Sequence, residues 1–466
     1  MSEQAKFLRG NLMRHVVVMS GASSVGLLAV FLVDFVDMVF IGMLGKAELA
    51  AAIGYAGAIL FFTTSVGVGM AIAAGALVAR RLGAGEPDRA REVATHVLAF
   101  AIGVGLCFAA TVWLNLRTLA GLLGATGETL DLSVGYLAII IPAMPFMMVG
   151  MVCGAILRAH GDARRAMWST ISGGLVNAVL DPILIFGLDL ELTGAAIASA
   201  AARITIMAVG VQAVVRHHGG FTRLRPPGFI ADMRDIAGIA GPAILTNMAT
   251  PVGTAYVTRQ MAQFGEEAVA GMAIVTRLTP VSFAVIFALS GAIGPIIGQN
   301  YGAGQHERVR VAFRDGLIFV GCYTLLVAGL LFALRGPLAA LFEAQGVTRE
   351  LLFLFCGPLA LLWFFNGSVF VCNAAFNNLG HPLRSTGLNW GRHTIGTVPL
   401  VWLGAAWLGA PGVLIGQALG GVIFGLIGVG LARHLMLRQA AGDLPVRERP
   451  AFSRRARLVQ LFDLRR

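Results

Sequence analysis

The chain has 466 residues, of which 57% are hydrophobic and 13% charged, and its mean hydropathy is +0.79. Soluble domains carry about 25% charged residues, so this composition excludes a soluble globular protein and indicates an all-α polytopic membrane protein. A net charge of +11 would by itself suggest a nucleic-acid partner, but its distribution along the chain indicates membrane topology instead.

Twelve apolar runs, each followed by a polar break, are expected to form twelve transmembrane helices. Runs of about 30 residues exceed the ~20 that span a bilayer, which predicts tilted or bent helices. The runs lie at about 15–41, 49–79, 92–114, 129–157, 167–188, 194–215, 236–261, 268–298, 315–334, 351–376, 386–408 and 413–434.

Lysine and arginine gather in alternate connections between these runs. The basic connections are 80–91, 158–165, 216–234, 308–314 and the one holding Arg384, together with the N-terminus and the tail. The opposite connections hold only Lys46, Arg117, Arg335 and Arg349. By the positive-inside rule, both termini are expected to be cytoplasmic.

The chain repeats itself at displacements of 217 to 219 residues: the loop 81–91 resembles 300–310, and Pro182 corresponds to Pro399. Because each half has an even number of crossings, the two halves are expected to be six-helix bundles related by a pseudo-two-fold axis along the membrane normal. The expected parts are an N-terminal bundle at 1–220, a C-terminal bundle at 221–441 and a basic cytoplasmic tail at 442–466.

Asn177 and Asp181 lie inside the apolar run 167–188, directly before Pro182. Four residues apart on a helix, their side chains share one face. A carboxylate at this depth is expected to face the protein interior or a wet cavity, and Pro182 frees the carbonyl of Ala178. These oxygens suit a proton or a small cation. The competing interpretation is a kinked helix whose Asp is satisfied by its packing neighbours.

Asp34 and Asp37 stand three residues apart in the first run. Two carboxylates within one turn of a low-dielectric helix repel each other, which favours the retention of a proton, as a proton carrier requires. The alternative is that one of them is solvated at the outer interface.

Three more side chains are candidates for the same site. Ser199 offers a hydroxyl, although a membrane Ser often bonds its own helix. Tyr136 can bond a carboxylate and present its ring to a cation, or it anchors at the outer interface. Arg203 is expected to snorkel toward the cytoplasm rather than pair with an Asp. Arg259 and Arg277 are expected to snorkel or to bond between helices.

Sequence motifs for other chemistry do not occur. A Walker motif, a GxSxG elbow and an HExxH pair are missing, so ATP-driven transport and hydrolysis lack their signatures, and we expect no enzyme. The cysteines stand in apolar runs without paired spacing, which is typical of small buried hydrophobic residues. They are Cys107, Cys153, Cys322, Cys356 and Cys372.

Several stretches in both halves resemble the multidrug and toxic compound extrusion (MATE) family of secondary transporters, bacterial type. They are 36–42, 81–85, 157–162, 177–182, 194–199 and 295–304. The resemblance implies a V-shaped twelve-helix exporter of the bacterial inner membrane, driven by a proton or sodium gradient. It also implies that Asp37, Asn177, Asp181 and Ser199 form the cation site, as the metal ligands if the ion is sodium, with Tyr136 beside it.

The sequence departs from the family pattern at three places. Residues 20–24 lack a proline that many members carry in the first helix, and Ser199 stands where Thr is usual. The acidic residues that one branch of the family has in its seventh and tenth helices are missing, which argues against sodium coupling in the second half.

We therefore predict a multidrug exporter that moves lipophilic, mostly cationic compounds by antiport with protons or sodium, with Asp37, Tyr136 and Asp181 contacting the substrate. The expected partners are small substrates and membrane lipids, with no nucleic acid. We expect a monomer without a cofactor other than the coupling ion. The alternative is an exporter or flippase of lipid-linked or amphipathic anionic cargo, which needs a deep cationic groove; Arg203, Arg259 and Arg277 are its candidates.

Overall fold

The computed structural model describes residues 5–44 and 46–442, which form helices and no strand. The first half begins with a 3-10 turn, η1 (Lys6–Leu8). It continues with α1 (Leu12–Met43), α2 (Ala47–Gly83), α3 (Pro87–Leu114), α4 (Leu116–Leu122), α5 (Gly127–Ile140), η2 (Ile141–Ala143), α6 (Met144–Ala159), α7 (Ala163–Pro182), η3 (Ile183–Gly187) and α8 (Glu191–His217).

The second half has the same organisation. It contains α9 (Pro226–Ala262), α10 (Glu266–Ser282), α11 (Ala284–Gly302), α12 (His306–Leu341), α13 (Gly346–Leu354), η4 (Phe355–Leu359), α14 (Ala360–Asn378), α15 (Pro382–Gly391), η5 (Arg392–Gly396) and α16 (Thr397–Ala440). The predicted tail falls almost wholly at 443–466, outside the described residues.

These elements make twelve membrane crossings. In the described part of the chain, ten stretches are long and apolar enough to span a membrane. One of them, 382–440, crosses twice, and α9 adds a further crossing. Several crossings consist of two helices joined by a short 3-10 or π turn, such as α5–η2–α6, where Pro142 and Pro145 interrupt the regular hydrogen bonds.

The double crossing turns at Gly409, whose φ of 64° and ψ of −143° are accessible to glycine and strained for other residues. The two arms then pack so closely that a Cβ on Gly404 would lie 2.1 Å from the carbonyl oxygen of Gly412. The runs 386–408 and 413–434 are therefore two antiparallel crossings, as the sequence predicts.

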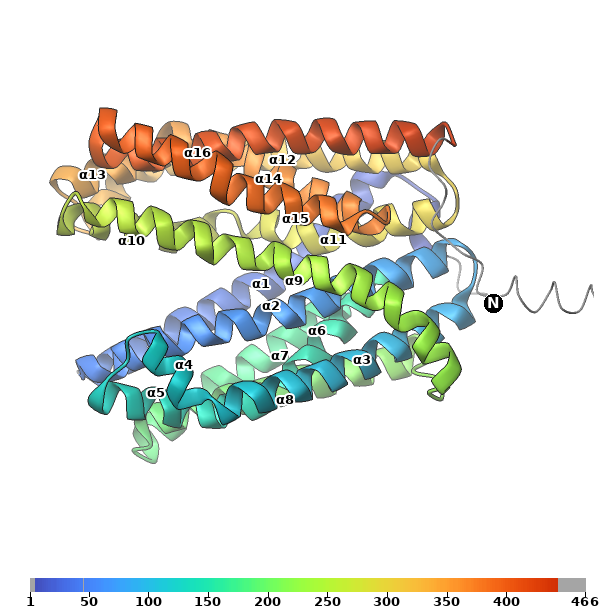
Figure 1. Ribbon diagram of the computed structural model, residues 1–466, viewed down its shortest axis with the longest axis horizontal. Coiled ribbons are helices and arrows are strands. Elements are labelled where there is room, and N and C mark those ends of the chain that lie inside the picture. The colour runs from blue at the N-terminus through green and yellow to red at the C-terminus, as the bar shows by residue number, and fades with distance from the viewer. Residues whose placement is uncertain (1–4, 45, 443–466) are drawn as a thin grey trace, which may run out of the picture.

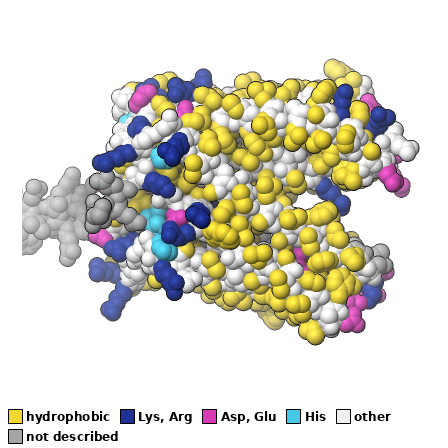
Figure 2. Space-filling view, turned by 180° about the vertical axis from the view of Figure 1, so that it is seen from behind, with side chains coloured by type: hydrophobic (Ala, Val, Ile, Leu, Met, Phe, Trp, Pro, Cys, Tyr) yellow, Lys and Arg dark blue, Asp and Glu magenta, His cyan; other side chains and the backbone are white. Residues whose placement is uncertain are grey.

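The crossings form two bundles (Figure 1). Helices α1–α8 make one bundle and α9–α16 the other, and α9 also packs against α2 of the first bundle. The bundles meet at the end that carries the N-terminus, which we call the basic end because the Arg-rich connections lie there (Figure 2). They separate toward the opposite end, which we call the open end.

Symmetric backbone contacts join the bundles at the basic end. A Cβ on Gly83, the last residue of α2, would lie 2.0 Å from the carbonyl oxygen of Gln299 on α11. A Cβ on Gly302, the last residue of α11, would lie 2.0 Å from the carbonyl oxygen of Arg80 on α2. Both pairs of equivalent positions, 83 with 302 and 80 with 299, are 219 residues apart. The contact is therefore isologous about the pseudo-two-fold axis.

Side chains repeat the same symmetry. Nε of Arg80 donates to the carbonyl oxygen of Asn378 at 2.8 Å, and Nε2 of Gln299 donates to that of Ala159, also at 2.8 Å. Residues 159 and 378 end α6 and α14, and they too are 219 apart. Each bundle thus satisfies a terminal helix carbonyl of the other, a group that has no partner within its own helix.

The segment before α1 binds both bundles at this end. Nζ of Lys6 donates to the carbonyl oxygen of Gly161 at 2.9 Å, whereas the Phe7 N–H donates to Oε1 of Gln299 at 2.9 Å. The carbonyl oxygen of Phe7 accepts from Nη2 of Arg308 at 2.9 Å, and the Phe7 ring is fully buried. The chain start therefore reinforces the closure.

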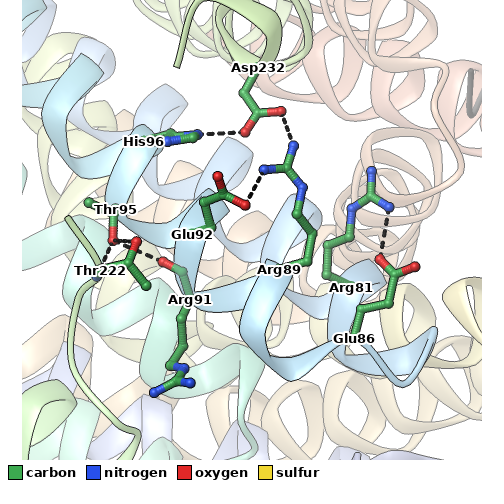
Figure 3. Close-up of polar contacts among 9 residues, drawn as sticks. All are labelled: Arg81, Glu86, Arg89, Arg91, Glu92, Thr95, His96, Thr222 and Asp232. Carbon is green, nitrogen blue, oxygen red and sulfur yellow. Dashed lines mark hydrogen bonds and ion pairs between the residues drawn. The ribbon is translucent and has the colours of Figure 1, made fainter. Parts of the chain in front are cut away.

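The connection after α8 and the start of α9 are fixed to α3 (Figure 3). Asp232 accepts from Nη2 of Arg89 at 2.5 Å and meets Nδ1 of the buried His96 at 2.6 Å. The Thr222 N–H donates to the hydroxyl of Thr95 at 2.9 Å. These contacts anchor the second bundle to the first where the chain passes between them, near the predicted boundary at 220.

A methyl group added at the contact between the bundles is expected to destabilise it. We expect Gly83→Ala and Gly302→Ala each to lower stability by about 1–3 kcal/mol, because the opposing backbone cannot yield without separating the bundles. Gly103→Ala is the matched control, since no heavy atom lies within 4 Å of a Cβ there. Thermal unfolding of the purified chain in detergent measures the difference. Equal midpoints for all three variants would contradict the rigid contact.

Candidate functional site

A cavity of about 1050 Å³ lies between the two bundles, and both bundles line it. Its walls come from α1, α2, α6, α7 and α8 on one side, and chiefly from α9, α10, α11 and α14 on the other. Figure 2 shows the surface hollowed between the bundles at the open end. The contacts at the basic end close the cavity on the other side, so it is accessible from one end.

A cluster of two carboxyls and one amide faces this cavity from α1 and α7. Nδ2 of Asn177 donates to Oδ1 of Asp37 at 3.2 Å and also to Oδ2 of Asp181. Asp37 and Asn177 line the cavity, whereas Asp181 lies behind them with 0% of its surface exposed. One amide thus holds two carboxyls from two helices together.

The local structure of α7 suits this arrangement. The α-helix ends at Pro182, and residues 183–187 form a single π turn in which the Leu188 N–H bonds the carbonyl of Ile183 at 2.9 Å. Such turns are frequent at functional sites. Within the described residues, Oδ1 of Asp181 has no hydrogen-bond partner. A free carboxyl oxygen beside a bridged pair leaves a place for a proton or an ion.

Two like charges held this close in a low-dielectric site repel strongly, so the pair favours a state with one bound cation. In the arrangement seen here, Asn177 turns its N–H group toward both carboxyls. That orientation stabilises a carboxylate next to a protonated partner.

Tyr136 and Ser199 lie beside the cluster. Tyr136 is within electrostatic reach of Asp37 and Asp181, and its hydroxyl faces that of Ser199. The sequence interpretation of Tyr136 as an anchor at the membrane interface therefore does not apply. Asp34 belongs to α1, but its side chain lies outside the described residues.

Arg203 lies elsewhere than the sequence predicts. It does not extend to the basic end but lines the cavity, where Nη1 donates to the carbonyl oxygen of Ile140 at 3.0 Å and to Sδ of Met144 at 3.1 Å. The Met144 N–H bonds Ile141 in a 3-10 turn. That turn leaves the carbonyl of Ile140 as a natural acceptor for the guanidinium, which is why Arg203 stays at mid-membrane depth.

Sequence reasoning missed two arginines of the cavity. Arg158, assigned to a basic connection, lies between α6 and α11, with its Nη1 3.4 Å from a Cβ built on Gly154 and its Nε 3.5 Å from one on Gly291. Arg392 stands inside the apolar run 386–408, where any charge is a functional candidate. That rule would have found it.

The two second-half arginines that the sequence suggested are not in the cavity. Arg259 and Arg277 are exposed, and Arg277 approaches Sδ of Met38 at 3.7 Å. Of the three arginines expected for the anion-exporting alternative, Arg203 therefore faces the cavity, together with Arg158 and Arg392, which were not expected there.

Two six-helix repeats around a cavity that is open at one end and closed at the other are the architecture of a membrane transporter. The MatE family model matches residues 22–183 and again 242–403, more than half of the chain, with the second match displaced by 220 from the first. The chain belongs to this family, and the predicted repeat of two related halves is confirmed.

Several known proteins are similar to most of the chain. The FAD transporter of Shewanella oneidensis is 28% identical over 93% of this chain and 97% of its own length. The multidrug export protein MepA of Staphylococcus aureus is 23% identical over 70% of this chain and 73% of its own. The Vibrio cholerae MATE transporter VcmN in the bent form matches with a TM-score of 0.86 and 25% identity, over 91% of this chain and 97% of its own.

Removal of the bridging amide is expected to destabilise the chain. Asn177→Ala leaves two carboxyls without their shared donor, which should cost about 1–3 kcal/mol. Ser172→Ala, on the same helix but half-buried, is the matched control, because within the described residues its hydroxyl bonds the carbonyl oxygen of Trp168 at 2.7 Å and takes no part in the cluster. Thermal unfolding in detergent compares the two. A midpoint of Asn177→Ala no lower than that of Ser172→Ala would rule out a structural role for the bridge.

Proposed function

We propose that this protein exports amphipathic compounds across the bacterial inner membrane by antiport with protons. The observation that carries the proposal is the cluster of Asp37, Asn177 and Asp181 at the wall of a cavity between two bundles. Carboxyls inside a membrane-spanning segment are energetically costly, and where they occur they mark proton or ion pathways.

The basic end is proposed to face the cytoplasm, following the positive-inside rule. In the arrangement described here the cavity is then open to the outside, and a proton from that side reaches Asp37. Protonation removes a charge that holds a cationic substrate and so favours its release. Reopening at the basic end would deliver the proton to the cytoplasm and admit the next substrate. The chain is proposed to work as a monomer without a cofactor.

The substrate class has two candidates. Lipophilic cations are supported by the Asp37 carboxylate, which lines the cavity, and by the similarity to a protein named for multidrug export. Tyr136 lies beside the carboxyl cluster but is not among the residues that line the cavity. Amphipathic anions are supported by Arg158, Arg203 and Arg392 in the same cavity, and by the similarity to a protein named as an FAD transporter.

Coupling is tested in liposomes that hold the purified chain and a pre-set pH gradient, without sodium. Addition of ethidium, a lipophilic cation, is expected to dissipate the gradient. Asp181→Asn should reduce this to the level of protein-free liposomes, because an amide cannot carry the proton. Asp131→Asn is the control, since Asp131 is exposed and pairs with Arg117 at 2.6 Å, away from the cavity.

Other results would change the proposal. If liposomes with the Asp181→Asn variant lost the pH gradient as fast as those with the unaltered chain, the cluster would not carry the coupled proton. Ethidium transport that starts only when sodium is supplied would make the same oxygens a sodium site.

A further inference from the structure

The cavity holds a second polar cluster on the half that lacks carboxylates. Arg392 begins η5, is 8% exposed and lines the cavity. Its Nη1 donates to Oδ1 of Asn366 at 2.8 Å, and its Nη2 donates to Nε2 of His393 at 2.7 Å. Within the described residues its Nε has no partner. Neutral groups alone therefore hold a buried guanidinium.

This situation is unusual for an arginine inside a membrane protein, because such charges normally pair with an opposite charge or reach the interface. His393 accepts from the guanidinium and is thus neutral. The charged residues among the described lining of the cavity are Asp37, Arg158, Arg203 and Arg392, three positive and one negative, which gives a net formal charge of +2. Asp181 lies directly behind Asp37, so among the described residues three arginines face two carboxyls.

An aromatic cluster on α11 and α14 lines the same cavity. The ring centroids of Phe287 and Trp363 lie 5.8 Å apart, those of Phe287 and Phe370 lie 5.3 Å apart, and all three side chains line the cavity. On α14, Trp363, Asn366 and Phe370 follow one another at about one turn, so they share a face. Asn366, which accepts a hydrogen bond from Arg392, therefore lies between Trp363 and Phe370 on this face of α14.

We propose that this wall is a phosphate subsite: the Arg392 guanidinium binds a phosphate of the substrate, and the rings of Trp363 and Phe287 contact a planar aromatic group. A guanidinium matches phosphate with two parallel hydrogen bonds. The substrate class is an aromatic phosphate ester. This assignment rests on the proposed export function and names its substrate. Lipid headgroups share the phosphate, but the aromatic cluster favours the soluble ester.

Binding of three flavins to the purified full chain in detergent tests the subsite. Riboflavin, FMN and FAD share one fluorescent ring and carry no phosphate, one phosphate and two phosphates. Contact with an indole quenches flavin fluorescence, so quenching reports affinity. We expect FMN and FAD to bind more tightly than riboflavin.

Substitutions of Arg392 test whether this side chain causes the preference for phosphate-bearing flavins. Arg392→Gln should weaken FMN binding by about tenfold or more, the size expected for lost hydrogen bonds to a charged group, and leave riboflavin unchanged. Arg392→Lys should restore part of the affinity. Arg277→Gln, which removes an exposed arginine outside the cavity, is the matched control and should behave like the unaltered chain.

Equal affinity of the unaltered chain for FMN and riboflavin overturns the subsite, and this comparison needs no variant to fold. Equal effects of Arg392→Gln and Arg277→Gln on FMN binding overturn it as well. Translocation of a fluorescent phosphatidylglycerol that depends on Arg392, without FMN binding, overturns the aromatic class and identifies a lipid headgroup.

The two experiments distinguish a failure of the phosphate subsite from a failure of the proposed export function. If ethidium dissipates the pH gradient through Asp181 but FMN does not bind preferentially, the export function stands and the subsite fails. If FMN binding depends on Arg392 but no substrate couples to an ion gradient, the subsite stands and the proton antiport fails.

Discussion

The backbone contact between α2 and α11 determines the rest of this structure. Because Gly83 and Gly302 have no side chain, the two bundles touch at the basic end through their main chains, and Arg80 and Gln299 satisfy helix carbonyls across the boundary. Helices fixed at one end and diverging toward the other enclose a cavity. Polar side chains deep in the membrane are tolerated only where they face such a cavity or other protein.

The two halves share an architecture but differ in the charged side chains that they place near the cavity. The first half places Asp37 and Asn177 at the cavity with Asp181 behind them, and the second half places Arg392 beside a neutral amide and a neutral imidazole. A transporter with this asymmetry is able to hold a proton on one wall and an anionic group on the other.

The sequence alone determined the membrane class, the twelve crossings, the two repeated halves and the pairing of Asn177 with Asp181. These properties depend on hydropathy, on internal similarity and on a spacing of four residues along one helix. All three can be read along the chain without knowing how the helices pack. Asp37 could be added only through the family resemblance, because it comes from another helix.

The tertiary structure decided which arginines face the cavity. Helical periodicity gives the face of a side chain relative to its own helix, but the direction of the cavity depends on how the other helices pack. Arg203 was therefore expected at the cytoplasmic end although it bonds Ile140 at mid-depth, and Arg259 and Arg277 turned out to be exposed. Arg158 and Arg392 gained their position in the cavity only through the meeting of the two bundles.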